Sequence, residues 1–392
     1  MKKFLVLATI ILFFNVNSIP SEGNIIEKES FKLMSDGNIL YVGGSGLDNY
    51  TRIQDAIDNA SDGDTIFVYD DSSPYNENIV INKSINLIGE NRYTTYIDGS
   101  LNQSLSAVYI SSKNVILSDF TILKYGINNY SYDDYVIYIQ SDYNIISGNI
   151  LTGNITYGIR IGGSQYNNIS DNFITNNINI GILLICSNYT NISNNYFSKV
   201  LSGIGLYYSN NNDIISNFIS NCGTGIFLLG TKSNYIYGNI ITNNEMGIRS
   251  ESYIQADSFS ANNIIIRNNI SYNKFYGLFI MNPLEDEVIQ NNFIGNKYNA
   301  YFFYQIYYGL RARYLIGSKP YILKIFWNSN YWDEPRLQSY FIPGFITFYS
   351  LNYLIRCIRI LYNDPEPDLY TLPINWFNMD KNPAKQPYNI SI

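Results

Sequence analysis

Short apolar runs alternate with polar turns along most of this chain. In the stretch NNISDNFITNNINIGILLIC, from Asn167 to Cys186, an apolar run, a polar turn, a second run, and a Gly followed by a third run make one unit. Runs of three to five residues separated by Asn, Gly and Ser are too short for helices and are typical of β-strands. The pattern therefore predicts a coil with about three strands per turn.

The unit recurs with a nearly fixed period. An Asn that precedes an apolar residue, followed by an apolar residue or Ser, returns at spacings of 23, 23, 22, 22, 30 and 23: Asn149, Asn172, Asn195, Asn217, Asn239, Asn269 and Asn292. A Gly before Ile or Leu keeps the same period: Gly158, Gly181, Gly203, Gly225, Gly247 and Gly277. Such a period is typical of a solenoid, in which each unit buries its apolar face against its neighbours. The one long spacing indicates a loop insertion at residues 250–261.

Stacked rungs about 4.8 Å apart would place like residues over like. The second residue after each Asn is expected to face inward, in a ladder that only Ser271 breaks: Leu151, Ile174, Phe197, Ile219, Ile241 and Ile294. The repeated Asn side chains are expected to hydrogen-bond to their copies on neighbouring rungs. We therefore interpret these asparagines as structural rather than catalytic.

Strand alternation turns the first residue after each Asn outward. This predicts an outer row of large apolar side chains: Ile150, Phe173, Tyr196, Phe218, Ile240, Ile270 and Phe293. Its aromatic members Phe173, Tyr196, Phe218 and Phe293 are the candidate ligand-binding residues, because aromatic rings stack on sugar rings. Two alternatives remain open, in which the C-terminal segment covers the row or copies of the chain associate through it.

Both ends of the repeat have segments that can cover a solenoid. Residues 51–60 place apolar side chains on one helical face, with Thr51 and Gln54 as a capping box and Gly63 as a stop. After about Asn299 the period ends and an aromatic-rich tail begins, which we expect to form an irregular cap. The expected domains are a signal peptide at 1–18, a linker at 19–40, a β-helix with its N-terminal cap at 41–299, and a C-terminal capping segment at 300–392.

Residues 51–91, TRIQDAIDNASDGDTIFVYDDSSPYNENIVINKSINLIGEN, followed by repeats such as NNISDNFITNNINIGILL, resemble right-handed parallel β-helix proteins of the NosD-like type. The resemblance covers roughly residues 41–300, and the tail with NYWDEPR and PAKQPY looks like the ending of some archaeal surface members. It implies an all-β fold, a right-handed single-stranded parallel β-helix of the pectate-lyase superfold with about ten or eleven coils. It implies no single activity, because this superfold hosts lyases, hydrolases, esterases, adhesins and structural proteins.

The NosD-like resemblance also carries an association with periplasmic copper delivery. The chain has no His, its three Cys are out of register and its five Met are scattered, so soft or imidazole ligands for copper are scarce. We do not carry the copper role over, and we expect no cofactor and no metal.

The composition limits the classes of partner that the chain can bind. A net charge of -7 offers no basic patch for nucleic acid or an anionic membrane. Lys2 and Lys3 precede an apolar stretch, Phe4 to Phe14, that is too short to span a bilayer and has the form of a secretory signal. We expect a secreted or cell-surface protein without a membrane span after signal cleavage, with a polysaccharide or surface glycan as partner.

Candidate catalytic groups are few. Without His there is no Ser-His-Asp arrangement, and no Asp or Glu recurs at matching positions on adjacent rungs. Asp133 and Asp134, within the Tyr-rich interval GINNYSYDDYVIY, are the catalytic candidates, although acidic pairs are usually solvated loops. Arg160 and Arg249 would share one outer face but lie four rungs, about 19 Å, apart.

Three functions remain. The first is a non-catalytic surface module that binds polysaccharide or forms a structural element. The second is a polysaccharide lyase, hydrolase or esterase that uses Asp133 and Asp134. The third is an assembly role through the outer face.

Overall fold

The computed structural model describes residues 37–102, 106–126, 134–176, 178–252, 260–282, 285–306, 325–333, 340–348, 372–380 and 383–390. All of them belong to one compact unit, Met34–Ile392. The expected signal peptide at 1–18, most of the expected linker and Asp133 lie outside the described residues.

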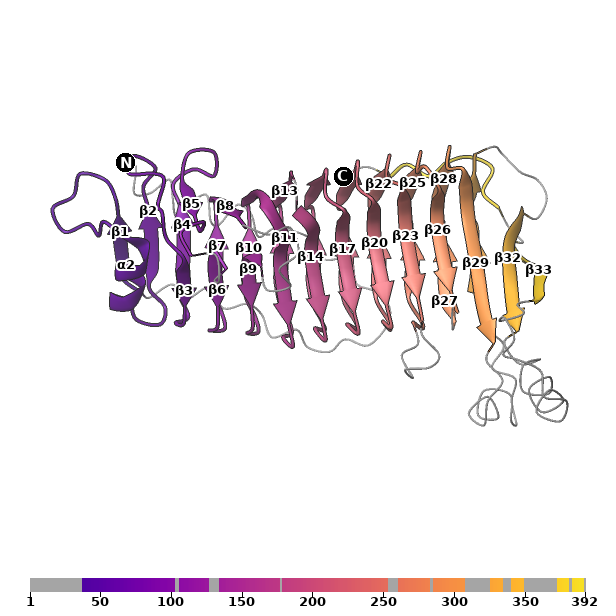
Figure 1. Cartoon of the computed structure of the whole chain (residues 1–392), viewed down its shortest axis with the longest axis horizontal. Helices are drawn as coiled ribbons and strands as arrows, with labels where there is room; N and C mark the ends of the chain where they lie inside the picture. Colours follow the sequence, from indigo (N-terminus) through magenta and orange to yellow (C-terminus); the bar gives the residue numbers. More distant parts are fainter. Residues whose placement is uncertain are drawn as a thin grey trace, which may run out of the picture. The chain divides into compact units, whose positions relative to one another are not determined.

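Three sheets of short strands form this unit, and successive coils stack in parallel (Figure 1). Sheet A has twelve strands: β1 (Ile39–Val42), β2 (Thr65–Val68), β4 (Asn86–Gly89), β7 (Ile116–Ser118), β10 (Ile145–Ser147), β12 (Asn168–Ser170), β15 (Asn191–Ser193), β18 (Asp213–Ile215), β21 (Tyr235–Tyr237), β24 (Ile264–Ile266), β27 (Asp286–Ile289) and β30 (Ile325–Asn328). The all-β parallel β-helix that the repeat predicts is thereby confirmed.

Sheets B and C complete each coil. Sheet B contains β5 (Tyr96–Asp98), β8 (Thr121–Tyr125), β11 (Ile150–Gly162), β13 (Phe173–Thr175), β16 (Tyr196–Ser198), β19 (Phe218–Ser220), β22 (Ile240–Thr242), β25 (Asn269–Ser271), β28 (Asn292–Ile294) and β31 (Tyr331–Trp332). Sheet C contains β3 (Ile79–Ile81), β6 (Val108–Ile110), β9 (Tyr135–Ile139), β14 (Ile178–Ile185), β17 (Ser202–Tyr207), β20 (Thr224–Leu229), β23 (Met246–Glu251), β26 (Tyr276–Met281), β29 (Tyr298–Ile306), β32 (Tyr340–Phe348) and β33 (Leu372–Asp380). The long strand β11 bends and pairs in both sheets.

The interior ladder is continuous, and this corrects one register. Ile241 of β22 pairs with Ile270, Ile270 with Phe293, and Phe293 with Trp332, all of them fully buried. Phe293, expected on the outer face, therefore points into the core, and Ser271 does not interrupt the ladder. The expected register is one residue too late in the last two of these coils. Asn268–Asn269 and Asn291–Asn292 are Asn pairs, and in each pair it is the first Asn that occupies the position that Asn239 has in its own coil.

The repeated Asn side chains form a buried hydrogen-bond ladder, as expected. The backbone N–H of Asn172 donates to Oδ1 of Asn195 at 3.0 Å, and the side-chain amide of Asn172 donates to the same oxygen at 3.0 Å. The pattern runs through eight members: Asn149, Asn172, Asn195, Asn217, Asn239, Asn268, Asn291 and Asn330. Each amide thus satisfies backbone groups at a tight corner where water is excluded.

Helix α2 (Ile53–Asn59) packs on β1, β2 and β3 at the N-terminal end of the stack (Figure 1). The expected Thr51–Gln54 capping box is wrong, since the N-cap residue is Arg52 and it makes no side-chain cap. Instead the carboxylate of Glu77 accepts the backbone N–H groups of Ile53 (2.8 Å) and Gln54 (3.0 Å). At the other end Lys83 donates to three carbonyl oxygens, those of residues 57, 58 and 60. A glutamate and a lysine from the neighbouring coil therefore complement the helix dipole.

The stack continues past Asn299, in a region expected to be irregular. Strands β30, β31 and β32 pair in parallel with β27, β28 and β29, and β33 then pairs antiparallel with β32. The segment Asn330–Tyr331–Trp332 repeats the Asn, outward, inward pattern, but a 39-residue spacing from Asn291 hides it in the sequence. Asp380 of β33 accepts the N–H of Asn330 (3.0 Å) and Nε1–H of Trp332 (3.1 Å), and so ends the Asn ladder.

Candidate functional site

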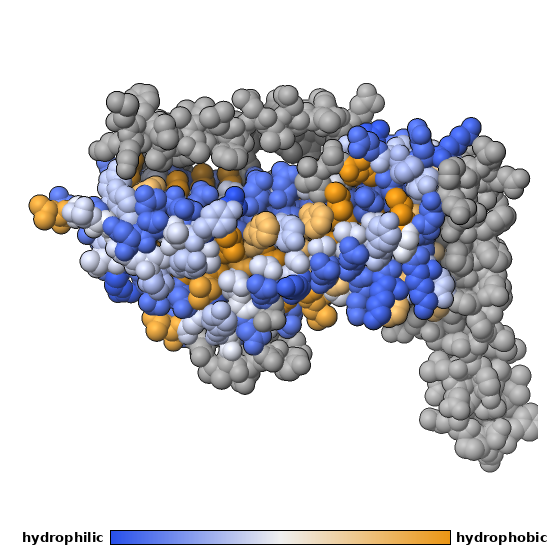
Figure 2. Space-filling view, turned by 90° about the horizontal axis from the view of Figure 1, so that it is seen from above, coloured by the Kyte–Doolittle hydropathy of each residue, from blue (hydrophilic) through white to orange (hydrophobic). Residues whose placement is uncertain are grey.

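The outer face of sheet B carries the predicted aromatic row in shortened form. Phe173 stacks on Tyr196 with ring centroids 4.2 Å apart, and Tyr196 on Phe218 at 5.2 Å. We call these three residues the sheet B aromatic ladder. Phe173 is 43% exposed, whereas Tyr196 and Phe218 are half-buried. Figure 2 shows apolar side chains exposed at several places on a mainly polar surface.

Ring orientation limits what this ladder can bind. The interplanar angles are 12° and 4°, so the rings lie face to face along the stack. A sugar stacks on the face of an aromatic ring, and here neighbouring rings occupy those faces. The sheet B aromatic ladder presents ring edges to solvent.

The C-terminal segment reaches the same outer face. The backbone N–H of Tyr388 donates to Oδ1 of Asn292, and the amide of Asn292 donates to the carbonyl of Tyr388, each at 2.8 Å. Asn292 lies three rungs beyond Phe218 in the outward register. Residues 383–390 thus cover the C-terminal end of this row and leave Phe173 open.

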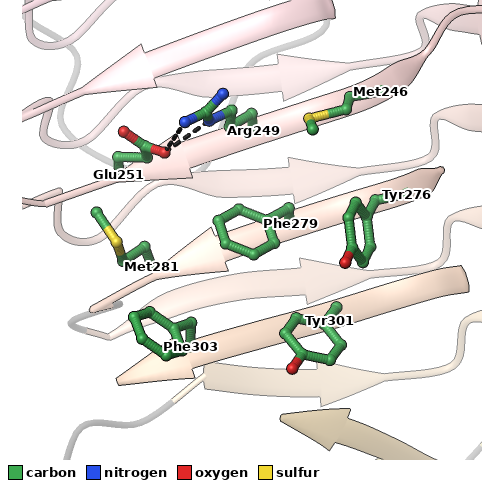
Figure 3. A pocket seen from close by; sticks show the side chains of 8 residues that line it. All are labelled: Met246, Arg249, Glu251, Tyr276, Phe279, Met281, Tyr301 and Phe303. Carbon is green, nitrogen blue, oxygen red and sulfur yellow. Dashed lines mark hydrogen bonds and ion pairs between the residues drawn. The ribbon is translucent and has the colours of Figure 1, made fainter. Parts of the chain in front are cut away.

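A second surface lies on the outer face of sheet C. A shallow depression of about 400 Å³ crosses β23, β26 and β29. We call it the sheet C depression, and it is lined by Met246, Arg249, Glu251, Tyr276, Phe279, Met281, Tyr301 and Phe303. Figure 3 shows their side chains spread over three adjacent strands, with the aromatic rings at the centre.

Tyr276 lies at an angle to its two neighbours in the sheet C depression. It meets Phe279 at 55° and Tyr301 at 50°, with centroids 5.5 Å apart in both pairs. Phe279 and Tyr301 themselves lie nearly parallel, at 7° with centroids 6.0 Å apart, and Tyr276 also stacks on Tyr298 at 24°. Burial, and then the nearby Tyr276, raise the pKa of the Tyr301 hydroxyl to about 12, so that it remains a hydrogen-bond donor at neutral pH.

One ion pair borders the aromatic rings of the sheet C depression. Nε of Arg249 donates to Oε1 of Glu251 at 2.6 Å, and a second guanidinium nitrogen contacts the same oxygen. The guanidinium also lies 5.3 Å from the centroid of Phe227, one rung away. These contacts hold a charged donor group in a fixed position beside the rings (Figure 3). Arg160 lies four rungs away on the same face, as expected, and its guanidinium packs over Tyr135 and Tyr138.

The catalytic candidates do not form an open site in the described part of the chain. Asp133 is outside it, and Asp134 is only 4% exposed, directly before β9. Asp134 lies beside Lys124 of β8 rather than in a groove. A polymer in solution has no access to a carboxyl group in that position.

A different pair of carboxyl groups shares a turn position that sequence reasoning did not connect. Asp119 and Asp171 each follow a sheet A strand with positive φ (64° and 57°), and Gly148 occupies this position on the rung between them. Arg92 donates to the carbonyl of Asp171 at 3.3 Å. Burial, the larger effect, raises the pKa of both carboxyl groups, and Arg92 lowers it. The signal was present in the sequence, as Asp, Gly and Asp at the same point of three successive units.

Metal-ligating side chains do not converge within the described ranges. These contain no group of three or more Cys, Asp or Glu that could hold a metal ion, and the chain has no His. Met246 and Met281 line the sheet C depression at opposite ends of neighbouring strands, about 16 Å apart by strand rise. Burial raises the pKa of the Cys222 thiol to about 11, which keeps it protonated, and Cys186 is exposed and unpaired.

Comparison with known proteins gives one family. The family described as periplasmic copper-binding protein (NosD) matches residues 57–256, just over half of the chain. The residues above do not fit the copper in that description, because copper sites need converging imidazole, thiolate or thioether ligands. No curated protein sequence matches the chain. In the described part of the chain, no helix is long and apolar enough to cross a membrane.

One solved structure supports the fold. The Dettilon tailspike protein is 15% identical, over 72% of this chain and 57% of its own, with a TM-score of 0.52, and at this identity the likeness concerns the fold alone. The periplasmic alginate epimerase AlgG is 15% identical over 61% of this chain and 60% of its own (TM-score 0.48). The catalytic domain of a GH87 alpha-1,3-glucanase is 14% identical over 74% and 62% (TM-score 0.46). The chain thus spans less than two thirds of each.

Proposed function

The chain belongs to the NosD family of right-handed parallel β-helix proteins, and on this premise we propose that it is an extracytoplasmic module that binds polysaccharide without cleaving it. The observation that carries the proposal is the sheet C depression, where the rings of Tyr276, Phe279 and Tyr301 lie beside the Arg249–Glu251 ion pair. The signal-like N-terminus and the periplasmic description of the family support a place outside the cytoplasm.

The chemistry of a sugar matches this surface. A sugar ring has an apolar face that packs on aromatic rings and a rim of hydroxyl groups that need donors and acceptors. Arg249, whose side chain is 39% exposed, supplies donors and Tyr301 supplies a hydroxyl, whereas the buried Glu251 holds the guanidinium in place. A volume of about 400 Å³ is within the range of roughly 300–1,000 Å³ that small-ligand sites have. The open form of the depression suits a segment of an extended polymer.

The test is retention of the purified protein by acidic and neutral polysaccharides in affinity electrophoresis, with new reducing ends measured in the same samples. We expect retention by at least one polymer without new ends, and at least about a fivefold loss of affinity in Phe279→Ala and Tyr301→Ala, since base stacking on aromatic residues in other systems contributes about 1–3 kcal/mol. Tyr237→Ala removes an aromatic ring from sheet A and is the matched control. Equal loss in all three variants, or retention by no polymer, would reject the proposal.

Polysaccharide hydrolysis is a second candidate, favoured by Asp119 and Asp171 beside Arg92. Two rungs separate their backbones by about 10 Å, close to the roughly 6.5–9.5 Å between carboxyl groups in inverting glycosidases. A raised pKa suits a carboxyl group that donates a proton. New chain ends that disappear in Asp119→Asn and Asp171→Asn, but persist in Phe279→Ala, would replace the binding proposal with this one.

A further inference from the structure

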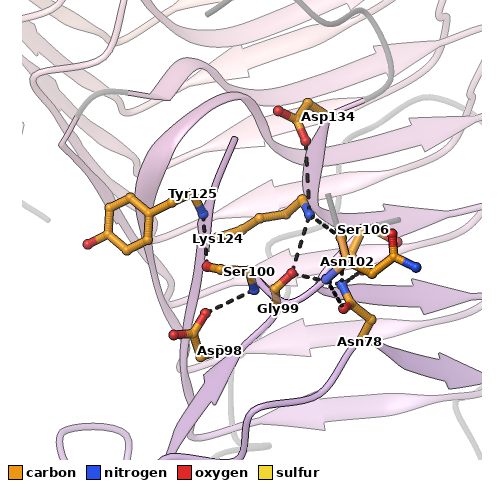
Figure 4. A network of polar contacts seen from close by, with 9 residues as sticks. All are labelled: Asn78, Asp98, Gly99, Ser100, Asn102, Ser106, Lys124, Tyr125 and Asp134. Atoms are coloured by element: carbon orange, nitrogen blue, oxygen red, sulfur yellow. Dashed lines mark hydrogen bonds and ion pairs between the residues drawn. The ribbon is translucent and has the colours of Figure 1, made fainter. Parts of the chain in front are cut away.

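A lysine and an aspartate lie buried together within one coil near the N-terminal end. Lys124 of β8 is 0% exposed and Asp134, just before β9, is 4% exposed. Nζ of Lys124 is 4.0 Å from Oδ1 of Asp134. Figure 4 shows Nζ between this carboxyl group on one side and the backbone carbonyls of Gly99 and Asn102 on the other. Neither function proposed above uses this pair.

The contacts of Nζ point its third direction at Asp134. Nζ donates to the carbonyl oxygens of Asn102 at 3.0 Å and Gly99 at 3.3 Å. Asn78 holds both carbonyls in place, since its side-chain amide donates to Gly99 at 2.8 Å and Asn102 at 3.3 Å. A neutral amine has two N–H groups and one lone pair, so two fixed acceptors leave the lone pair directed toward the remaining neighbour. That neighbour is the carboxyl group of Asp134.

The surroundings favour the neutral forms of both groups. Oδ1 of Asp134 is buried and has no hydrogen-bond partner, and the two groups are too far apart for a hydrogen-bonded ion pair. A buried pair without such bonds does not recover its desolvation cost. Burial lowers the pKa of Lys124, against the opposing effects of Asp134 and Asp98, and raises the pKa of Asp134, against that of Lys124. Both shifts are toward the neutral forms, which are the forms that react in amide formation.

We propose that Lys124 and Asp134 are a modification site, at which Nζ of Lys124 forms an intramolecular isopeptide bond with Cγ of Asp134. The Nζ lone pair attacks Cγ, one amine proton passes to the carboxyl hydroxyl group, and that hydroxyl group leaves as water. The products are one amide and one water, and no oxidant or other co-reactant is needed. Fixed geometry lowers the entropic part of the activation barrier, because reactants held in a near-attack arrangement reach effective concentrations of about 10⁵ M or more.

The bond would join two strands of one coil. β8 pairs with β11 in sheet B and β9 pairs with β11 in sheet C, so Lys124 and Asp134 both belong to the coil that precedes β11. The product also replaces two ionisable groups in a buried site with one neutral amide. The bond would fix β8 of sheet B to the start of β9 of sheet C within this coil.

The test is tryptic peptide mapping of the full chain, made in a bacterial host that attaches no N-glycans and digested after denaturation. Trypsin does not cut after a lysine whose amine is acylated. We therefore expect one peptide, residues 114–160, lighter than its sequence mass by one water, with fragment ions that join Lys124 to Asp134. Cleavage after Lys124, giving separate peptides 114–124 and 125–160, would overturn the proposal, because a succinimide at Asp134 also loses water but leaves Lys124 cleavable.

Variants separate the bond from other causes of missed cleavage. Lys124→Arg and Asp134→Ala should each abolish the water loss. Lys83→Arg is the control and should leave the water loss intact, because Lys83 donates to carbonyl oxygens. Water loss that persists in Asp134→Ala would also overturn the assignment. The peptide map of the unaltered chain tests the proposal even where a variant fails to fold.

Discussion

At the scale of single residues, the side chains that recur in this chain are those that satisfy buried backbone groups. Asn195 illustrates the arrangement, because its Oδ1 accepts two hydrogen bonds from Asn172 while its own amide donates to Ile169, Ser193 and Asn217. No other uncharged side chain offers one acceptor and two donors in this space. The ladder is therefore an obligatory feature of the fold.

Replacement of one ladder residue should be costly. In Asn195→Ala the N–H groups that now bond to Asn195 lose their partner in a dry environment, and each such loss costs about 1–3 kcal/mol. We expect the free energy of unfolding to fall by about 2 kcal/mol or more. Urea unfolding followed by circular dichroism measures this, with Thr175→Ala on the outer face of sheet B as the control. A midpoint equal to that of the control would contradict the role of the ladder.

A buried acid should make stability depend on pH. A second ladder runs from Asn212 through Asn234 and Asn263 to Asp286, each amide donating to Oδ1 of the next member. Asp286 accepts two hydrogen bonds from Asn263 through Oδ1, and its Oδ2 is buried without a partner. Burial raises its pKa to about 7. Between an unfolded pKa near 3.8 and this folded value, only the folded chain keeps the proton, so stability falls as pH rises from about 4 to 7.

The variant Asp286→Asn tests this dependence. It continues the ladder with a neutral amide and should unfold at a higher temperature than the unaltered chain at pH 8, with the difference shrinking toward pH 4. Thermal unfolding across this pH range is the measurement. An advantage of the variant that stays constant with pH would mean that Asp286 does not titrate as described.

The register of these residues was predictable for five coils and then wrong by one. At Asn268–Asn269 only Asn269 precedes an apolar residue, and the choice of Asn269 kept the outer row apolar. The structure has the other register: Asn269 takes the outward position, and Ile270 fills the core. Interior demands are stricter than surface ones, and they would have given the correct register.

At the scale of elements, the turn into sheet C depends on glycine. An added Cβ at Gly203 would lie 2.7 Å from the carbonyl oxygen of Gly225 and 2.8 Å from Cγ2 of Ile219. The same approach to the next rung recurs at Gly158, Gly181, Gly225, Gly247 and Gly277. The landmark glycines are therefore explained by the close contact of successive backbones, which sequence periodicity indicates but cannot explain.

Alanine at one of these glycines should strain the stack. We expect Gly203→Ala to lower the free energy of unfolding by about 1–3 kcal/mol, the usual cost of overpacking. Gly162→Ala is the matched control, because an added Cβ there has no neighbour closer than 3.6 Å. Equal urea midpoints for the two variants would show that the rungs can move apart freely.

The candidate site was only partly predictable at this scale. Arg249 was assigned to an outer face, but the aromatic residues beside it come from the continuation of the same register, Phe227, Arg249, Phe279 and Tyr301. An Asn-based alignment follows sheet B and does not reveal this row. Aligning the second residue after each landmark Gly would have found Phe227 and Phe279, whereas the orientation of the rings depends on side-chain packing that a sequence does not express.

At the scale of the whole unit, ladders of hydrogen bonds run between two covered ends. Glu77 and Lys83 fix helix α2 at the first coils, and Asp380 of the antiparallel strand β33 ends the Asn ladder. Between them the solvent-facing surfaces are free to differ from rung to rung without disturbing the core. That freedom allows members of one family to carry different outer surfaces on the same core.

The most direct measurement of the binding account is hydroxyl-radical footprinting of the protein with and without a retained polysaccharide. We predict that protection from oxidation centres on Met246, Tyr276, Phe279 and Tyr301 of the sheet C depression, while Phe173 of the sheet B aromatic ladder reacts equally in both samples. Protection at Phe173 without protection at Tyr276 and Phe279 would place the ligand on sheet B and contradict the account.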